Sequence, residues 1–164
     1  MSTLSKQMIL AIDPGPEESA FMKLTRDGYP SNMLCFGRRS NDAVVKFLRS
    51  VWLDKHDTVV IEEIQNQGMP IGKTTIQTAM WTGRFVQVAT DIGFPVVLVG
   101  RRDIKLHWCG DMRAKDPNVR QALIDHYGPP GTKKAPGVTY GIKKDVWSAL
   151  AIAGYWHAKQ QRRA

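Results

Sequence analysis

Cysteine is scarce in this sequence, which contains only Cys35 and Cys109 among 164 residues. Neither has a second cysteine at the two-residue spacing that is typical of metal and redox motifs. Two cysteines also cannot build the disulfide framework that stabilises small secreted domains. We therefore expect two buried free thiols and a fold that depends on its hydrophobic core.

Long apolar runs are absent as well. No stretch approaches the roughly 20 residues that a membrane-spanning helix requires. The first residues lack the charged, apolar and cleavage-site regions of a signal peptide. We expect a soluble cytoplasmic protein with no membrane partner.

Acidic residues are in the minority, because 15 Asp and Glu stand against 23 Lys and Arg and give a net charge of +8. Such an excess suits a polyanionic partner, of which nucleic acid is the first candidate and an anionic membrane surface the second. With 43% hydrophobic residues, the chain is long enough for one domain and too short for two. We expect a single domain over residues 1–158 and a basic tail over 159–164.

The spacing of apolar residues predicts an α/β domain with one mixed sheet covered by helices. Strands are expected at 7–13, 19–25, 32–37, 58–63 and 95–100. The first three are joined by short turns, which favours an antiparallel meander. Helices are expected at 41–53, 73–93, 117–127 and 142–158.

Several residues have the chemistry of helix ends. Ser40 or Asn41 can cap the helix at 41–53. Asp116 is expected as an N-cap, with Pro117 at the first helical position and Gly128 as the C-cap.

Carboxylates stand at the ends of two predicted strands. Asp13 ends the first strand, whereas Glu62 and Glu63 end the fourth, and Asp145 lies in the first turn of the last predicted helix. Acids gathered in one place repel one another, so such a cluster is stable mainly when divalent cations neutralise it. Hard oxygen ligands favour magnesium or manganese. Alternatively, Asp13 caps its turn, a glutamate pairs with a surface arginine, and Asp145 interacts with the helix dipole.

Basic residues are concentrated after the fifth predicted strand. Such a run can neutralise phosphates without reading a sequence, or it can form a solvated charged face. Lys73 follows GMPIG, which is one residue too short for a phosphate-binding loop, so we expect no nucleotide cofactor. It can still meet a DNA phosphate at a helix N-terminus. The candidate DNA-binding residues are Lys73, Arg101, Arg102, Lys105, Arg113, Lys115, Arg120, Lys143 and Lys144.

Four stretches in order resemble the RuvC-type Holliday-junction resolvases of the RNase H-like superfamily. They are ILAIDPG, VVIEE, the segment from GRRDIK to AKDPNVRQALI, and KKDVWSALAIA. The small size is similar to the phage-encoded branch, which would place the protein in the cytoplasm of a bacterial host. The resemblance implies an RNase H-like fold with a central mixed five-stranded sheet, a homodimer, and paired symmetric nicks in four-way and other branched DNA. It also implies two-metal hydrolysis with Mg²⁺, or Mn²⁺ as a substitute.

The resemblance assigns Asp13, Glu62 and Asp145 as catalytic metal ligands. Glu62 is preferred because the family's acid directly follows the apolar triplet, here VVI, and because neighbouring strand residues face opposite ways. Glu63 remains the alternative. Lys105 and Lys115 match the family's catalytic basic residues near the scissile phosphate, although one extra residue follows Lys115.

The sequence departs from the family at Ser148, where a second acid is usual three residues after Asp145. Both positions share one helical face, so Ser148 could hold a metal-bound water or bond a ligand, but it carries no charge. Either one ion then binds weakly, or another acid substitutes, for which Glu63 and Asp103 are the candidates. A branched-DNA binding protein with a decayed metal site, or a nuclease acting on RNA:DNA hybrid, are the alternative functions.

Overall fold

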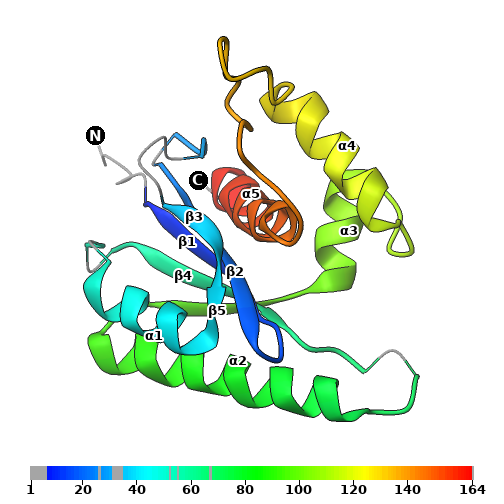
Figure 1. Ribbon diagram of the computed structural model, residues 1–164. Coiled ribbons are helices and arrows are strands. Elements are labelled where there is room, and N and C mark those ends of the chain that lie inside the picture. Colours follow the sequence, from blue (N-terminus) through cyan, green and yellow to red (C-terminus); the bar gives the residue numbers. More distant parts are fainter. Residues whose placement is uncertain are drawn as a thin grey trace.

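The computed structural model describes residues 7–25, 27–30, 35–51, 53–54, 56–66 and 68–163. Within these residues the chain forms five strands and five helices (Figure 1). The strands are β1 (Ile9–Asp13), β2 (Glu18–Leu24), β3 (Phe36–Ser40), β4 (Thr58–Glu63) and β5 (Val96–Gly100). The helices are α1 (Asn41–Ser50), α2 (Lys73–Ile92), α3 (Arg101–Cys109), α4 (Asp116–Tyr127) and α5 (Val146–Arg163).

The strands form one mixed five-stranded sheet, as predicted, and their order in it is β3-β2-β1-β4-β5. The first three strands are an antiparallel meander. β1 and β4 are parallel, with Ile12 opposite Ile61, and β4 and β5 are also parallel. Parallel pairing brings the carboxyl ends of β1, β4 and β5 to the same edge of the sheet.

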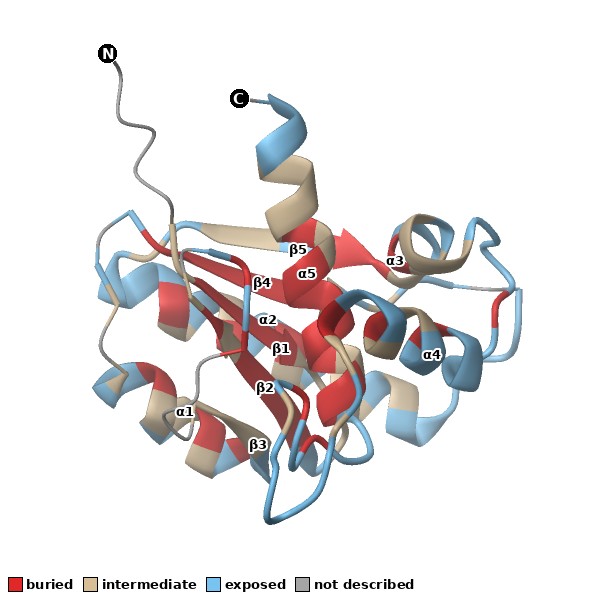
Figure 2. Ribbon diagram, turned by 90° about the horizontal axis from the view of Figure 1, so that it is seen from above, coloured by how far each residue is buried: buried red, intermediate tan, exposed pale blue. Residues whose placement is uncertain are grey.

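Each face of the sheet has its own hydrophobic core, because strand residues alternate in direction. Ile9 and Ala11 belong to the core under α3, α4 and α5, whereas Leu10 and Ile12 belong to the core under α1 and α2. Figure 1 shows α1 and α2 on one side of the sheet and α5 on the other. Figure 2 shows that the buried residues of α5 lie against the strands. The structure therefore confirms the α/β sheet flanked by helices.

Strand β3 lies later in the sequence than predicted. It spans Phe36–Ser40 instead of 32–37, and residues 31–34 are outside the described part of the chain. β3 is an edge strand that pairs only with β2, and Arg38 and Arg39 are exposed on it. Its sequence therefore lacks alternating apolar and polar residues. The apolar residues within 32–37 lead to a predicted strand that begins too early.

Two helices differ from the prediction. Helix α3 was missed, because only Ile104 is buried among its nine residues and the segment reads as a basic run. Helix α5 was predicted at 142–158 but begins at Val146 and continues to Arg163, so residues 159–163 are helical and not a separate tail. Lys159 lies over the rings of Tyr155 and Trp156, a contact that supports these last turns.

The helix ends mostly agree with the sequence. The Ser40 hydroxyl accepts a hydrogen bond from the Ala43 amide, so Ser40 is the N-cap of α1. That helix ends at Ser50, not at 53, and Trp52 lies outside the described residues. Gly93 and Gly128 are the C-caps of α2 and α4. The N-cap of α4 is Lys115, however, because Asp116 is already helical.

The structure also describes the two cysteines and the apolar character of the helices. Cys35 and Cys109 are free thiols, as predicted, but they are half-buried and not fully buried. None of the helices that the structure describes has both the length and the apolar character that crossing a membrane requires.

Candidate active site

The acids at the strand ends lie side by side on one face of the sheet. Asp13 and Glu62 follow Ile12 and Ile61, which are paired across β1 and β4. Ile61 packs in the core under α1 and α2, so Glu62 points to the opposite face, toward α5, and Glu63 points away from it. Glu63 is exposed, whereas the Glu62 side chain is 13% exposed. Of the two glutamates, the structure thus places Glu62 beside Asp13.

Burial makes the charged form of both acids unfavourable. Burial, with the nearby charges of Glu62 and Asp145, raises the pKa of Asp13 to about 8, against the opposing effects of Arg101 and a Ser148 hydrogen bond. The pKa of Glu62 is also raised, chiefly by burial, although Arg101 counteracts it. Two desolvated carboxylates that repel each other are stabilised by a bound cation.

Helix α5 brings two further predicted residues to the same place. Ser148 hydrogen-bonds Asp13 from the first turns of α5. Asp145 directly precedes the helix and is 55% exposed. Its Oδ2 lies 3.2 Å from Nε of Arg38, which also contacts Glu18 at 3.1 Å. Asp145 therefore reaches the site while an arginine of the edge strand holds its carboxylate.

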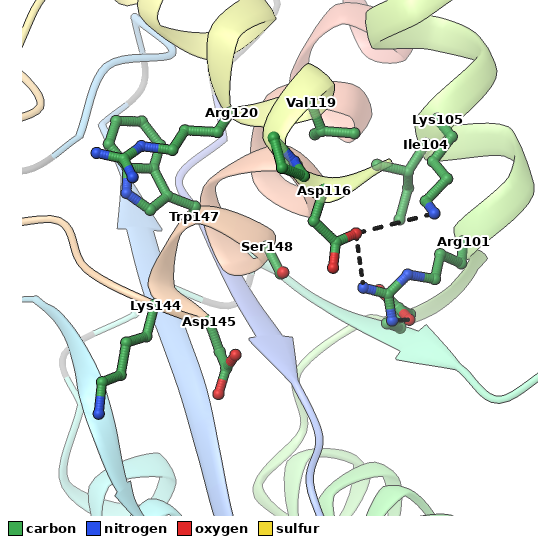
Figure 3. Close-up of a pocket in the computed structure, with 13 residues that line it drawn as sticks. Arg101, Ile104, Lys105, Asp116, Val119, Arg120, Lys144, Asp145, Trp147 and Ser148 are labelled. Atoms are coloured by element: carbon green, nitrogen blue, oxygen red, sulfur yellow. Dashed lines mark hydrogen bonds and ion pairs between the residues drawn. The ribbon is translucent and has the colours of Figure 1, made fainter. Parts of the chain in front are cut away.

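A cavity of about 330 Å³ lies between the sheet end and helices α3, α4 and α5. Figure 3 shows Asp145 and Ser148 on one side of it and Arg101 with Lys105 on the other. The lining residues are Glu62, Arg101, Ile104, Lys105, Asp116, Pro117, Val119, Arg120, Lys144, Asp145, Trp147, Ser148 and Ala151.

Asp116 lines the cavity, although its sequence context predicts only a helix cap. Its Oδ1 lies 3.3 Å from Nη2 of Arg101 and 3.8 Å from Nζ of Lys105. The other terminal nitrogen of Arg101 lies 3.5 Å from Oε1 of Glu62. A helix-capping aspartate and a cavity aspartate look alike in a sequence. Only the packing of α3 against α4 shows that Asp116 contacts Arg101 and Lys105.

Two basic residues line the opposite wall. The guanidinium of Arg120 lies 5.1 Å from the centre of the Trp147 ring, a cation-π contact that fixes its direction. Lys144 has a φ of 48°, which is unusual for a residue other than glycine. This turn presents Lys144 and Asp145 together at the cavity (Figure 3).

The remaining predicted DNA-binding residues do not line the cavity. Lys115 is exposed at the N-cap of α4, and Lys73 is exposed at the start of α2. Arg102, Arg113 and Lys143 are exposed as well. The acid Asp103, a predicted substitute for Ser148, is exposed on α3 and is not among the lining residues. These residues surround the site or lie apart from it.

The donor set can be tested against a divalent metal. Asp13 and Glu62 supply two buried carboxylates, and their hard oxygen atoms suit Mg²⁺ or Mn²⁺. In the described part of the chain, no group of three or more His, Cys, Asp or Glu side chains is gathered closely enough to hold a metal. Asp145 is paired with Arg38 through Oδ2, so an ion at the strand-end pair would compete with this arginine for Asp145. The residues thus fit an ion at the strand-end pair.

Sequence comparisons find no match, whereas solved structures with a similar fold exist. No protein-family model and no curated protein sequence matches the chain. The structure is similar to Thermus thermophilus RuvC, with a TM-score of 0.62, 18% identity and 96% coverage of both chains. It is also similar to T. thermophilus RuvC in complex with a Holliday junction substrate, with a TM-score of 0.64, 19% identity and the same coverage. The chain therefore has the fold of RuvC, a mixed five-stranded RNase H-like sheet flanked by helices.

Proposed function

We propose that this protein is a metal-dependent endonuclease that resolves four-way DNA junctions. The observation that carries the proposal is the pair of desolvated carboxylates, Asp13 and Glu62, at one edge of a RuvC fold. Glu62 lines a cavity together with Arg101, Lys105 and Arg120, and Asp13 lies beside Glu62 at the strand ends. This combination suits phosphodiester hydrolysis, because the acids can bind a cation and the basic residues can bind phosphate oxygens.

Each group then has a distinct task. Asp13 and Glu62 hold Mg²⁺, or Mn²⁺ in its place, with Asp145 as a further ligand. A bound ion would lower the pKa of a water molecule and polarise the phosphate. Lys105 is 19% exposed and directed at the cavity by Asp116, so it can donate to a phosphate oxygen. Lys115 and the exposed arginines around the cavity bind the flanking backbone.

We also propose that the protein acts as a homodimer, because paired symmetric nicks need two active sites. Strand β4 leads into α2 through a loop that, with the helix, forms an apolar groove of about 790 Å³. Met69, Ile71, Ile76 and Met80 line this groove with exposed fractions of 74%, 61%, 52% and 58%. An apolar surface of this kind suits a second copy of the chain. Light scattering should give a dimer for the native protein and a monomer for Met80→Glu.

A specific observation favours a second candidate, a branched-DNA binding protein that does not cut. Ser148 has no charge, and Arg38 holds Asp145. A site that lost its metal would keep its basic surface and its fold. Binding without cleavage is the property that separates this candidate from the first.

The deciding experiment is cleavage of a labelled four-way junction, beside linear duplex and RNA:DNA hybrid of matched sequence. Each substrate is incubated with Mg²⁺, Mn²⁺ or EDTA and resolved on a denaturing gel. The nuclease should place paired symmetric nicks in the junction alone and stop when EDTA is present. Tight binding without nicks under either metal would support the second candidate. Preferential cutting of the hybrid would support a hybrid nuclease.

A further inference from the structure

Arg101 enters the cavity because of the register of the sheet. β5 runs parallel to β4, with Val99 opposite Glu62. Arg101 follows Val99 by two residues, as the first residue of α3. Val99 belongs to the core under α5, so the chain delivers Arg101 to the face that carries Glu62. The position of this guanidinium is a consequence of the sheet and not of a flexible loop.

The Arg101 guanidinium bridges two carboxylates. One terminal nitrogen lies 3.5 Å from Glu62 and the other lies 3.3 Å from Asp116. Asp13 also interacts with Arg101 electrostatically. Contacts on both sides fix the planar group at the edge of the acid pair.

The charge of the site differs from what the family resemblance implies. An acid is usual at position 148, and here Ser148 hydrogen-bonds Asp13 without contributing charge. A cationic side chain is present beside Glu62 at the same time. Both features, the uncharged Ser148 and the nearby Arg101, lower the capacity of the site for positive ions, because a second divalent ion would have one ligand fewer and a guanidinium as its neighbour.

We propose that Arg101 supplies the second positive charge of this active site, so that each chain binds one divalent ion instead of two. The inference rests on the proposed nuclease function. Arg101 would contact the scissile phosphate, which its several N–H groups can do in a bidentate manner. Asp116 would keep the guanidinium oriented when Glu62 turns to the ion.

Manganese binding tests this directly, since Mn²⁺ can be counted by calorimetry and two adjacent Mn²⁺ ions give a spin-coupled paramagnetic resonance spectrum. The native protein should bind one Mn²⁺ per chain and give no coupled spectrum, both alone and when frozen with junction DNA before cleavage. The double variant Arg101→Leu with Ser148→Asp should bind two and give the coupled spectrum. Ions on DNA are uncoupled and do not interfere.

Single substitutions separate charge from structure. Arg101→Leu should tighten Mn²⁺ binding by about tenfold, because it removes a cation from Glu62. Arg101→Lys should leave the affinity within about threefold of the native value, since it keeps the charge. Arg49→Leu removes an exposed arginine of α1 on the other side of the sheet and should change nothing. Circular dichroism confirms that each variant is folded.

Three results would overturn the inference. A coupled Mn²⁺ pair in the native protein would mean that two ions fit beside Arg101, with the nuclease function intact. Equal Mn²⁺ affinities for the native protein and Arg101→Leu would mean that the guanidinium does not compete with the ion. No Mn²⁺ binding that depends on Asp13 would overturn the proposed metal-dependent function itself, and this inference with it.

Discussion

The acids of the site belong to two regions that differ in rigidity. Asp13 and Glu62 are held by paired strands and are largely removed from water. Asp145 stands on a turn before α5, is 55% exposed and is paired with Arg38. The first region is built by the sheet and is ready for a cation. The second already has a cationic partner in Arg38, so metal binding should depend on the two regions in different ways.

The two arginines that contact these acids come from opposite edges of the sheet. Arg38 lies on β3 at one edge, and Arg101 follows β5 at the other. The acids of β1 and β4 end between them. Each arginine forms an ion pair with a neighbouring carboxylate, so each should compete with a bound cation for that acid.

The largest effect is expected from the strand-end region. Asp13→Asn should reduce junction cleavage by at least about a thousandfold, because the ion loses its buried ligand. Junction affinity should stay within about threefold, since the cations that bind phosphate remain. Single-turnover cleavage and filter binding measure the two properties. Loss of both together would give Asp13 a structural role.

The two neighbouring glutamates provide a matched pair. Glu62→Gln should slow cleavage by about a hundredfold or more, because Glu62 faces the cavity. Glu63→Gln removes the same charge on the other face of β4 and should leave the rate within about twofold. Rates under saturating Mg²⁺ decide between them. Equal losses for both variants would contradict the direction that the sheet gives to Glu62.

Without metal, Asp13→Asn should make the protein more stable, although the same substitution slows cleavage. The pKa of Asp13 is raised by burial to about 8 in the folded chain, from about 3.8 when unfolded. The unfolded chain therefore releases this proton first, and the contribution of Asp13 to stability falls as the pH rises from about 4 to 8. Asn carries no such charge. In EDTA, Asp13→Asn should unfold several degrees above the native protein at pH 8 and near it at pH 4.

Calorimetric melting curves at both pH values test this expectation. A native protein that is as stable as Asp13→Asn at pH 8 in EDTA would show that the buried carboxylate bears no desolvation cost. Added Mg²⁺ should remove the difference at pH 8, because the ion stabilises only the chain that can bind it.

The smallest effect is expected from the exposed ion pair. Arg38→Leu should tighten Mn²⁺ binding by about two- to fivefold, because exposed ion pairs contribute about 0–1 kcal/mol. Arg39→Leu is the control, since Arg39 lies over the rings of Phe21 and Phe47 on the other face of the sheet. Calorimetric titration measures both variants. Weaker binding in Arg38→Leu would mean that Arg38 positions Asp145 instead of competing for it.

The strand-end region could be predicted from the sequence, because it depends on residues that are neighbours in the chain. Apolar runs that end in acid identify Asp13 and the pair Glu62 and Glu63, and the family resemblance favours Glu62. The core packing of Ile61 in the structure then gives the direction of Glu62. Parallel pairing of β1 and β4 was enough to bring the two acids together. The sheet and most helices follow from the same periodicities.

The other parts of the site depend on contacts between distant segments. Arg38 escaped notice because β3 was expected before it, so nothing indicated that it would reach Asp145. Asp116 has the sequence signature of a helix cap, and its role beside Arg101 arises only when α4 packs near α3. Ser148 was identified as a departure from the family, but its hydrogen bond to Asp13 required the placement of α5.

Anomalous scattering at the manganese edge can locate Mn²⁺ in crystals of the native protein. We expect a peak between the carboxylates of Asp13 and Glu62, on the face of the sheet that α5 covers. A peak elsewhere on the protein, or no peak in crystals soaked at saturating Mn²⁺, would contradict the claim that the strand-end acids are a metal centre.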